Sequence, residues 1–503
     1  MELAKNQEHT VTIEGYGEGG MGVARIDGRV VFVHGALRGE KCRVLILKTL
    51  KSVAFAKVLE VLEPSSERME SDCPYFPRCG GCTYRHIRYE EELRLKRQRV
   101  QDNLSRIGGS DVTVEEILGA QDTLRYRNKA QYPVSKDGAV GFYRARTHEV
   151  IECEHCLLVR PEADAAAEAL REYMQSCRVA GYDEKTGRGL IRHLYVRSNA
   201  AGESLICVLV NGDKLPKEDR LVALLRDACT KCTGIVLGTN TKKGNVILGD
   251  RYRTLWGSDR LEDTLCGKTF RLSVPSFYQV NRVQAERLYA KAIEFAGLTG
   301  QETVLDLYCG AGTITLALSD HAKKVLGAEI VPEAIDDARE NAARNGLTAN
   351  ARFETGDLRE HRRLYEHQSF DAVVVNPPYE DPGFGRRAEA ETNRLARQGE
   401  MCPLADVCEA SRFLLKNGGR LYMVMRALRL AETLALLRAR SLEPRELLMV
   451  HPAPGKNASV FLVEARRSGG TAVTVPPPLF IYNAAGEYTP ELRRFYAPAP
   501  PLP

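Results

Sequence analysis

The chain has 503 residues, of which 44% are hydrophobic and 27% charged, with a formal net charge of +5. This length predicts several domains and this composition supports real hydrophobic cores. No apolar run is long enough to predict a transmembrane helix and no N-terminal stretch resembles a signal peptide, so we expect a cytoplasmic protein without a membrane association.

Residues 1–66 are expected to form a small β-barrel. Segments that alternate apolar and polar residues, such as Gly28–Val33 and Lys41–Leu47, are separated by glycine-containing turns. Barrels of this size commonly bind oligonucleotides across one face, which predicts an RNA-binding role. A docking or solubility module is the alternative.

Cysteines dominate the next segment, residues 67–275, which we expect to be an α+β domain. Cys73, Cys79 and Cys82 lie close together and Cys156 follows much later, which is typical of metal-ligand spacing. Four thiolates suit a four-iron, four-sulfur cluster, with zinc as the alternative metal. Cys153 competes with Cys156 for the fourth position.

Basic residues in the same segment are mixed with aromatic residues. The basic residues are Arg125, Arg127, Lys129 and Arg144. The aromatic residues among them are Tyr126, Tyr132, Phe142 and Tyr143. Guanidinium and ammonium groups suit phosphates, and aromatic rings suit stacked bases, so we expect this mixture to bind structured RNA. A solvated, charged strand face is the alternative.

Residues 276–470 are expected to form a doubly wound α/β domain. An apolar strand at 304–308 runs into a turn containing Gly310 and Gly312, followed by the helical pattern 314–318. The next strand ends at Glu329, about twenty residues further, where such folds present a carboxylate to ribose hydroxyls. With Gly356 and Asp357, this order of elements predicts an S-adenosylmethionine site.

Asn376-Pro-Pro-Tyr379 follows the apolar run Phe370–Val375 and predicts methylation of an amine. The side-chain oxygen of Asn376 and the carbonyl of Pro377 would accept the two amine hydrogens, and Tyr379 would stack on a flipped base. We therefore expect these three residues to be catalytic and Asn376 also to contact the cofactor. A strand followed by a proline-rich turn is the alternative, and residues 471–503 are expected to form a C-terminal tail.

Several of these motifs together resemble a known family over about residues 10–357. The cysteine cluster, Arg125–Lys129, Gly141–Arg144, Ser276–Asn281 and Asp306–Gly312 are similar to the bacterial 23S rRNA uracil-5-methyltransferases that carry a TRAM domain and an iron–sulfur cluster. The resemblance implies a class I S-adenosylmethionine-dependent fold and a TRAM barrel. It also implies cofactor contacts from Gln279, Tyr308 and Glu329, and Cys156 as the fourth cluster ligand.

Residues from about 357 to 496 instead resemble the bacterial tRNA adenine-N6 methyltransferases. The uracil enzymes carry a nucleophilic cysteine on the strand that here reads Gly418–Arg426, which contains none. We considered Cys402 and Cys408 as displaced nucleophiles and predict that both are structural. Amine methylation needs no covalent step and is mostly a matter of positioning.

The combined expectation is a monomeric, S-adenosylmethionine-dependent RNA base methyltransferase acting on rRNA or tRNA. The predicted target is the exocyclic amine of adenine. The first alternative is carbon 5 of uracil in 23S rRNA. The second is a chimaeric protein that binds RNA and cofactor without transferring a methyl group.

Overall fold

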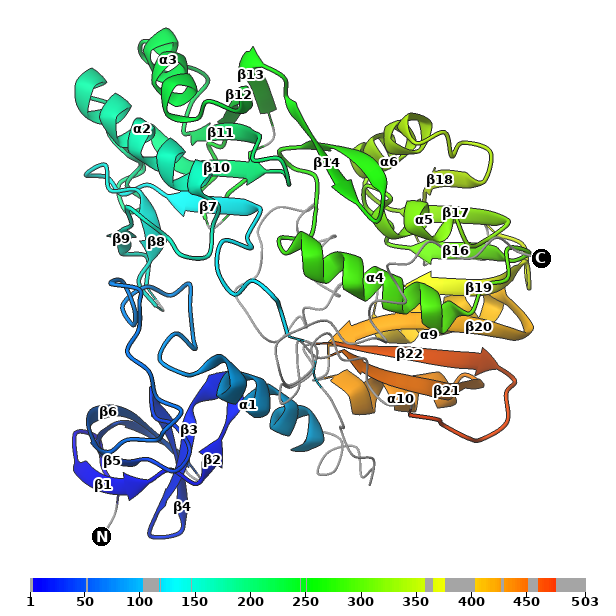
Figure 1. The fold of residues 1–503 in the computed structure, drawn as a ribbon, viewed down its shortest axis with the longest axis horizontal. Coiled ribbons are helices and arrows are strands. Elements are labelled where there is room, and N and C mark those ends of the chain that lie inside the picture. The colour runs from blue at the N-terminus through cyan, green and yellow to red at the C-terminus, as the bar shows by residue number, and fades with distance from the viewer. Residues whose placement is uncertain are drawn as a thin grey trace. The chain divides into compact units, whose positions relative to one another are not determined.

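The structure is a computed structural model that describes residues 3–50, 53–102, 117, 119–145, 147–244, 246–249, 251–357, 365–375, 403–426, 429–450 and 460–475. The chain up to Gly119 contributes to one compact unit, and the chain from Ala120 to Leu448, with the strand that begins at Val460, forms a second. Both appear as ribbons in Figure 1. The domain boundaries predicted after residues 66, 275 and 470 stay a prediction.

The first unit is built on a curled six-stranded sheet with the order β1-β5-β6-β4-β3-β2. Although β1 and β3 are not neighbours in this order, they contact each other, so the sheet curls round. Alternate residues of each strand point inward, and Val31, Val33, Val44 and Ile46 therefore share one core. The elements are β1 Glu8–Thr12, β2 Gly15–Tyr16, β3 Gly22–Ile26, β4 Arg29–His34, β5 Lys41–Thr49, β6 Val53–Glu63 and the helix α1 Tyr89–Asp102.

The second unit contains a five-stranded sheet with the order β13-β12-β11-β10-β7. Helices α2 and α3 share a core with one face of this sheet, and residues of β14 pack on the other face. Every residue of β10 and β11 is therefore buried. The elements are β7 Lys129–Pro133, β8 Gly141–Tyr143, β9 Val150–Glu152, α2 Pro161–Cys177, β10 Ile191–Ser198, β11 Ser204–Val210, α3 Glu218–Ala228, β12 Cys232–Thr239, β13 Arg251–Gly257, β14 Arg260–Leu265 and β15 Lys268–Ser273.

A seven-stranded sheet follows, with the order β18-β17-β16-β19-β20-β22-β21. The pairs from β18 to β20 are parallel, whereas β22 runs antiparallel to β20. Figure 1 shows α4 in front of the sheet and α9 and α10 behind it. The elements are α4 Arg282–Ala296, β16 Thr303–Leu307, α5 Thr313–Leu318, β17 Lys324–Glu329, α6 Pro332–Arg344, β18 Ala351–Thr355, β19 Phe370–Val375, α9 Leu404–Leu414, β20 Leu415–Arg426, α10 Leu430–Arg438, β21 Leu442–Val450 and β22 Val460–Arg467.

This topology agrees with the doubly wound sheet that the sequence predicts. The strand order reverses between β16 and β19, and ligands of open α/β sheets bind outside the carboxyl ends of the strands at such a switch point. None of the described helices combines the length and the apolar character needed to cross a membrane.

Candidate functional site

The glycine turn after β16 has an unusual backbone. Tyr308 and Gly310 both have positive φ, of 61° and 53°, and Gly312, at 82°, caps the start of α5. A Cβ at Gly312 would lie 2.9 Å from the Phe353 ring, whereas a Cβ at Gly310 would meet no atom of the described residues within 4 Å. The space beside Gly310 is therefore open, and a ligand can approach the backbone there.

Glu329 ends β17 and reaches across to this turn. Its Oε2 accepts a hydrogen bond from the Gly310 amide at 3.3 Å, and its Oε1 accepts from the amides of Ile330 and Val331 at 2.8 and 3.2 Å. Burial raises the pKa of the carboxyl group, and these three hydrogen bonds oppose the rise. The structure thus brings Gly310 and Glu329 together, as the sequence predicts.

Asp357 lies at the same edge of the sheet. It follows β18, and the neighbouring Gly356 amide donates a hydrogen bond to the Glu329 carbonyl at 3.0 Å. The carboxyl ends of β16, β17 and β18 therefore present Tyr308, Gly310, Glu329 and Asp357 side by side. All four are predicted cofactor contacts.

Replacing Glu329 by alanine is expected to weaken S-adenosylmethionine binding by about 1–3 kcal/mol, because a charged hydrogen-bond partner is lost. Calorimetric titration of the cofactor measures the change. Glu333→Ala is the matched control, since this exposed acid lies in the first turn of α6. Unchanged affinity of Glu329→Ala for S-adenosylmethionine would show that this carboxylate binds only backbone amides of the protein and not the cofactor.

Gln279 lies in the segment 276–281 between β15 and α4, and two buried side chains hold that segment. Arg197 donates a hydrogen bond to the Ser276 carbonyl at 2.5 Å, and Asn128 Nδ2 donates to the Gln279 carbonyl at 2.9 Å. Phe277 lies between these anchors, yet 67% of its surface is exposed. An exposed aromatic ring on a fixed backbone is suited to stacking on a base.

Sequence analysis did not single out Phe277 as a site residue. Tyr278 is buried, whereas Phe277 is exposed and Gln279 is partly exposed. The available signal in the sequence was the place of Phe277 in the Ser276–Asn281 motif.

The predicted catalytic residues Asn376, Pro377 and Tyr379 lie outside the described residues, as does Cys402. The strand that leads into them is described: β19 ends at Val375, which is paired with Leu307 of β16. β19 therefore ends at the carboxyl edge of the sheet, beside the strand that leads into Tyr308. Their catalytic roles stay a prediction.

Cys408 is fully buried on α9, and burial raises the pKa of its thiol to about 12. Cys309, in the glycine turn, is also buried, and its pKa lies well above the ordinary value for the same reason. Neither thiol is suited to act as a thiolate nucleophile at neutral pH. This agrees with the structural role predicted for Cys408.

The predicted metal ligands are divided between the two units, with Cys73, Cys79 and Cys82 in the first and Cys156 in the second. A hydrogen bond from Cys153 lowers the pKa of the Cys156 thiol to about 6, although burial opposes this shift. A thiolate is the form that binds a metal. Within the described part of the chain, however, no three His, Cys, Asp or Glu side chains are grouped as a metal site. The cluster stays a prediction from cysteine spacing.

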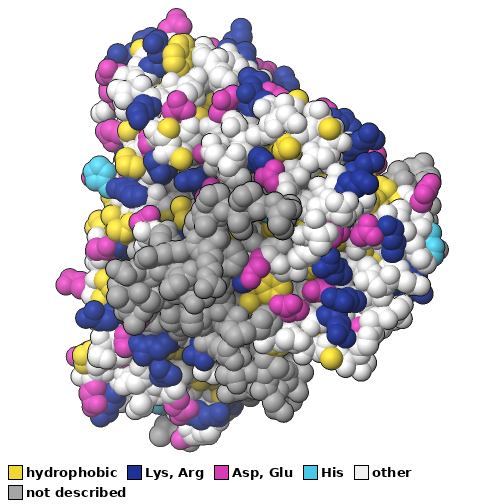
Figure 2. All heavy atoms as spheres, turned by 45° about the vertical axis from the view of Figure 1, so that its right-hand side comes forward, with side chains coloured by type: hydrophobic (Ala, Val, Ile, Leu, Met, Phe, Trp, Pro, Cys, Tyr) yellow, Lys and Arg dark blue, Asp and Glu magenta, His cyan; other side chains and the backbone are white. Residues whose placement is uncertain are grey.

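Some of the basic residues predicted to bind RNA are paired with acidic side chains of the protein. Arg125 donates to the Asp164 carboxylate at 2.7 Å, and Arg144 forms an ion pair with Glu149 at 2.7 Å. Figure 2 shows Lys and Arg side chains scattered among Asp and Glu over the face that it draws. The RNA-binding role of these two residues stays a prediction, as it does for Arg127 and Lys129.

Three families match this chain. The family described as tRNA (Uracil-5-)-methyltransferase matches residues 88–360, the TRAM domain matches residues 3–59, and a methyltransferase domain matches residues 298–439. The TRAM match confirms the assignment of the N-terminal sheet.

Similar proteins agree with these matches. Two uncharacterized RNA methyltransferases, from Halalkalibacterium halodurans and Listeria innocua, are 41% and 42% identical, covering 74% and 75% of this chain and 83% and 84% of their own. The crystal structure of the Pyrococcus abyssi tRNA (uracil-54, C5)-methyltransferase in complex with S-adenosyl-L-homocysteine has a TM-score of 0.68 at 21% identity. It covers 91% of this chain and 100% of that one, and shows a shared fold. This chain belongs to the tRNA (uracil-5-)-methyltransferase family and is an S-adenosylmethionine-dependent RNA methyltransferase.

Proposed function

We propose that this enzyme transfers a methyl group from S-adenosylmethionine to carbon 5 of a uracil in rRNA or tRNA. The observation that carries the proposal is the uracil-5-methyltransferase family match over residues 88–360, more than half of the chain. The adenine interpretation receives no support from the comparisons, which favour the uracil alternative.

The described residues supply two parts of this chemistry. Gly310 and Glu329 would hold the cofactor at the switch point, and the exposed ring of Phe277 would stack on the target base. Carbon 5 of uracil is a poor nucleophile, so the reaction also needs a thiolate that adds to the neighbouring ring carbon and a base that removes the carbon-5 proton. Cys309 and Cys408 are buried with raised pKa values, so the uracil proposal replaces the structural role that the sequence predicts for Cys402 by that of the nucleophile.

A second candidate is methylation of the adenine amine. Two observations favour it: β20 contains no cysteine, and Asn376-Pro-Pro-Tyr379 follows β19 directly. This reaction requires no thiol, because the amine attacks the methyl group once it is oriented.

Mass spectrometry of nucleosides distinguishes the candidates. The protein is incubated with isotope-labelled S-adenosylmethionine and unmodified rRNA and tRNA, and the RNA is then digested. Labelled 5-methyluridine is the expected product. Labelled N6-methyladenosine would contradict the uracil proposal and support the second candidate. If no labelled nucleoside forms, the protein binds RNA and cofactor without transferring a methyl group.

RNA containing 5-fluorouracil tests the covalent step. After methyl transfer, the thiolate is normally released when a base removes the proton from carbon 5. In 5-fluorouracil carbon 5 carries fluorine instead of that proton, so the thiolate stays attached to the base. We expect a stable adduct on denaturing gels that Cys402→Ala abolishes and Cys408→Ala does not. Methyl transfer to RNA without an adduct would contradict the uracil proposal.

We also propose that the cysteines bind a structural iron–sulfur cluster. Anaerobically purified protein is then expected to contain four irons per chain, the number that such a cluster requires. Cys79→Ser should lower stability and RNA binding more than cofactor binding, because no redox step is needed. Stoichiometric zinc without acid-labile sulfide would contradict the cluster.

A further inference from the structure

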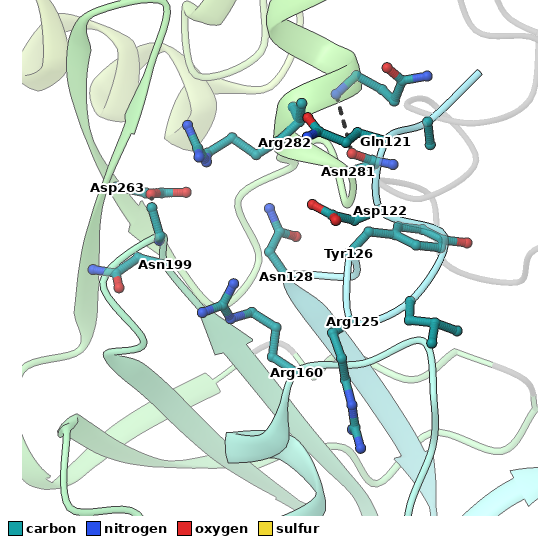
Figure 3. A pocket seen from close by; sticks show the side chains of 15 residues that line it. Gln121, Asp122, Arg125, Tyr126, Asn128, Arg160, Asn199, Asp263, Asn281 and Arg282 are labelled. Carbon is teal, nitrogen blue, oxygen red and sulfur yellow. Dashed lines mark hydrogen bonds between the residues drawn. The ribbon is translucent and has the colours of Figure 1, made fainter. Parts of the chain in front are cut away.

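A cavity of about 440 Å³ lies within the second unit and has no assigned role. It is bounded by the chain before β7, the turn after β10, β14 and the first turn of α4 (Figure 3). Buried polar side chains contribute to its wall, and these are Asn128, Asn199 and Asp263. A volume of this size and a few convergent polar groups are typical of small-ligand sites.

Asn128 presents a side-chain acceptor to this cavity. Only 7% of the residue is exposed, and its Nδ2 is committed to the Gln279 carbonyl. No described residue donates a hydrogen bond to its Oδ1. Asn199 differs, because its Oδ1 accepts from the Ala201 and Glu203 amides at 3.0 and 2.9 Å. Asn128 Oδ1 is therefore available to accept a hydrogen bond from a ligand in this cavity.

Asp263 contributes a carboxylate to the same space. It is only 5% exposed and is anchored by hydrogen bonds from the Ala200 and Thr264 amides at 3.2 and 2.9 Å. Figure 3 shows this carboxylate pointing toward the space bounded by Arg282 and Asn128, with Asp122 facing it from the opposite side. A fixed, buried carboxylate accepts hydrogen bonds strongly.

Two guanidinium groups complete the lining. Arg282 donates through Nη1 to Glu286 at 3.1 Å, and Arg160 lies 3.7 Å from Glu162 through Nε. Each guanidinium has five N–H donors, so both retain donors for a ligand. The cavity therefore combines anionic acceptors with cationic donors.

We propose that this cavity binds an unpaired guanine nucleotide of the RNA substrate. Guanine presents two adjacent N–H donors, at N1 and N2, which can converge on Oδ2 of Asp263, since Oδ1 already accepts from the Ala200 and Thr264 amides, and its O6 and N7 accept from an arginine. The ribose 2′-hydroxyl can donate to Asn128 Oδ1. Cytosine and adenine each offer one amine on their pairing edge and uracil offers one ring N–H, so they match the carboxylate less well.

This inference rests on the proposed function, because it assumes an RNA substrate. It also connects the cavity to the methyl-transfer site: Asn128 holds the Gln279 carbonyl, two residues beyond the exposed Phe277. A guanine bound here would therefore lie beside the segment proposed to hold the target base, and would help to select the RNA sequence around it.

Saturation-transfer NMR on the full-length protein with the four ribonucleoside 5′-monophosphates tests the cavity. We expect GMP to bind most tightly, and Asp263→Asn and Arg282→Gln each to weaken it by roughly tenfold through loss of a charged hydrogen-bond partner. Asp137→Asn is the charge-matched control, because this exposed acid lies in the turn after β7. Calorimetric cofactor binding and thermal unfolding confirm that each variant is folded.

Equal binding of all four nucleotides, or GMP binding unchanged in both cavity variants, would overturn the proposal. Preferential binding of CMP would overturn the assignment to guanine. None of these measurements requires methyl transfer, so failure of the cavity proposal is distinct from failure of the nucleoside assay.

Discussion

Replacing Arg68 by leucine is expected to destabilise the N-terminal sheet by about 3–5 kcal/mol, because it leaves a buried carboxylate without its cationic partner. Glu40 is 0% exposed, and Arg68 donates to its two oxygens at 2.5 and 2.8 Å. The Leu37 amide also donates to Glu40 at 2.8 Å, but a neutral donor does not replace the lost charge.

Hydrogen exchange of the amides in β4–β6, followed by mass spectrometry on the full chain, measures this loss. Arg43→Leu is the matched control: Arg43 also pairs with two acids, Glu8 and Glu60, but on the exposed surface. Exposed ion pairs contribute little, so we expect nearly unchanged exchange in the control. Equal exchange in both variants would contradict a stabilising role for the buried pair.

The contribution of the Glu40–Arg68 ion pair to stability decreases as the pH falls. Burial alone would raise the pKa of Glu40, but hydrogen bonds from Arg68 and backbone amides lower it below 4.5. A group with a lowered folded-state pKa contributes stability above its unfolded pKa and loses it as the pH falls through the folded value. In Arg68→Leu burial is no longer opposed by the guanidinium, so Glu40 takes up its proton at a higher pH than in the wild type, and the difference in stability between the two proteins should narrow as the pH falls through the variant's folded-state pKa.

The methyltransferase sheet could be predicted because its signals are local. The strand at 304–308, the glycine turn and the helical pattern 314–318 correspond to β16, the turn and α5. Glu329 was identified for a related reason: parallel strands present their carboxyl ends at one edge, so an acid ending β17 must lie near the turn after β16.

Partners distant in sequence could not be predicted in the same way. Arg125 belongs to a basic and aromatic stretch, but its carboxylate partner is Asp164, 39 residues further on. Asn128 lies in that stretch without a charge, and its partner is the Gln279 carbonyl, 151 residues away. Charge composition identifies cations but does not show which of them the fold has already neutralised.

The target base illustrates a different limit of sequence reasoning. Asn376-Pro-Pro-Tyr379 and the absence of a cysteine in β20 favoured the adenine amine, because these few residues bear on chemistry directly. The family match covers far more of the chain but ends at residue 360, before the chain reaches them. The two kinds of observation therefore concern different segments of the chain.

Replacing Asn376 by alanine is expected to reduce methyl transfer by about 10²–10³-fold, the usual cost of losing a polar group that acts in the transition state. RNA binding should change little, because phosphate contacts elsewhere supply most of that affinity. Single-turnover transfer of a labelled methyl group and filter binding of the same RNA separate the two effects.

The expected loss does not depend on which base is methylated. Val375 is paired with Leu307, so β19 ends at the carboxyl edge, next to the strand that leads to Gly310. An amide at this edge can accept from the adenine amine, or can both donate to and accept from uracil at its N3–H and O4 edge. Asn417→Ala is the matched control, because this exposed residue lies near the start of β20, at the opposite edge of the sheet. If Asn376→Ala kept more than about half of the wild-type rate of methyl transfer, the side chain at position 376 would not be the group that orients the target base.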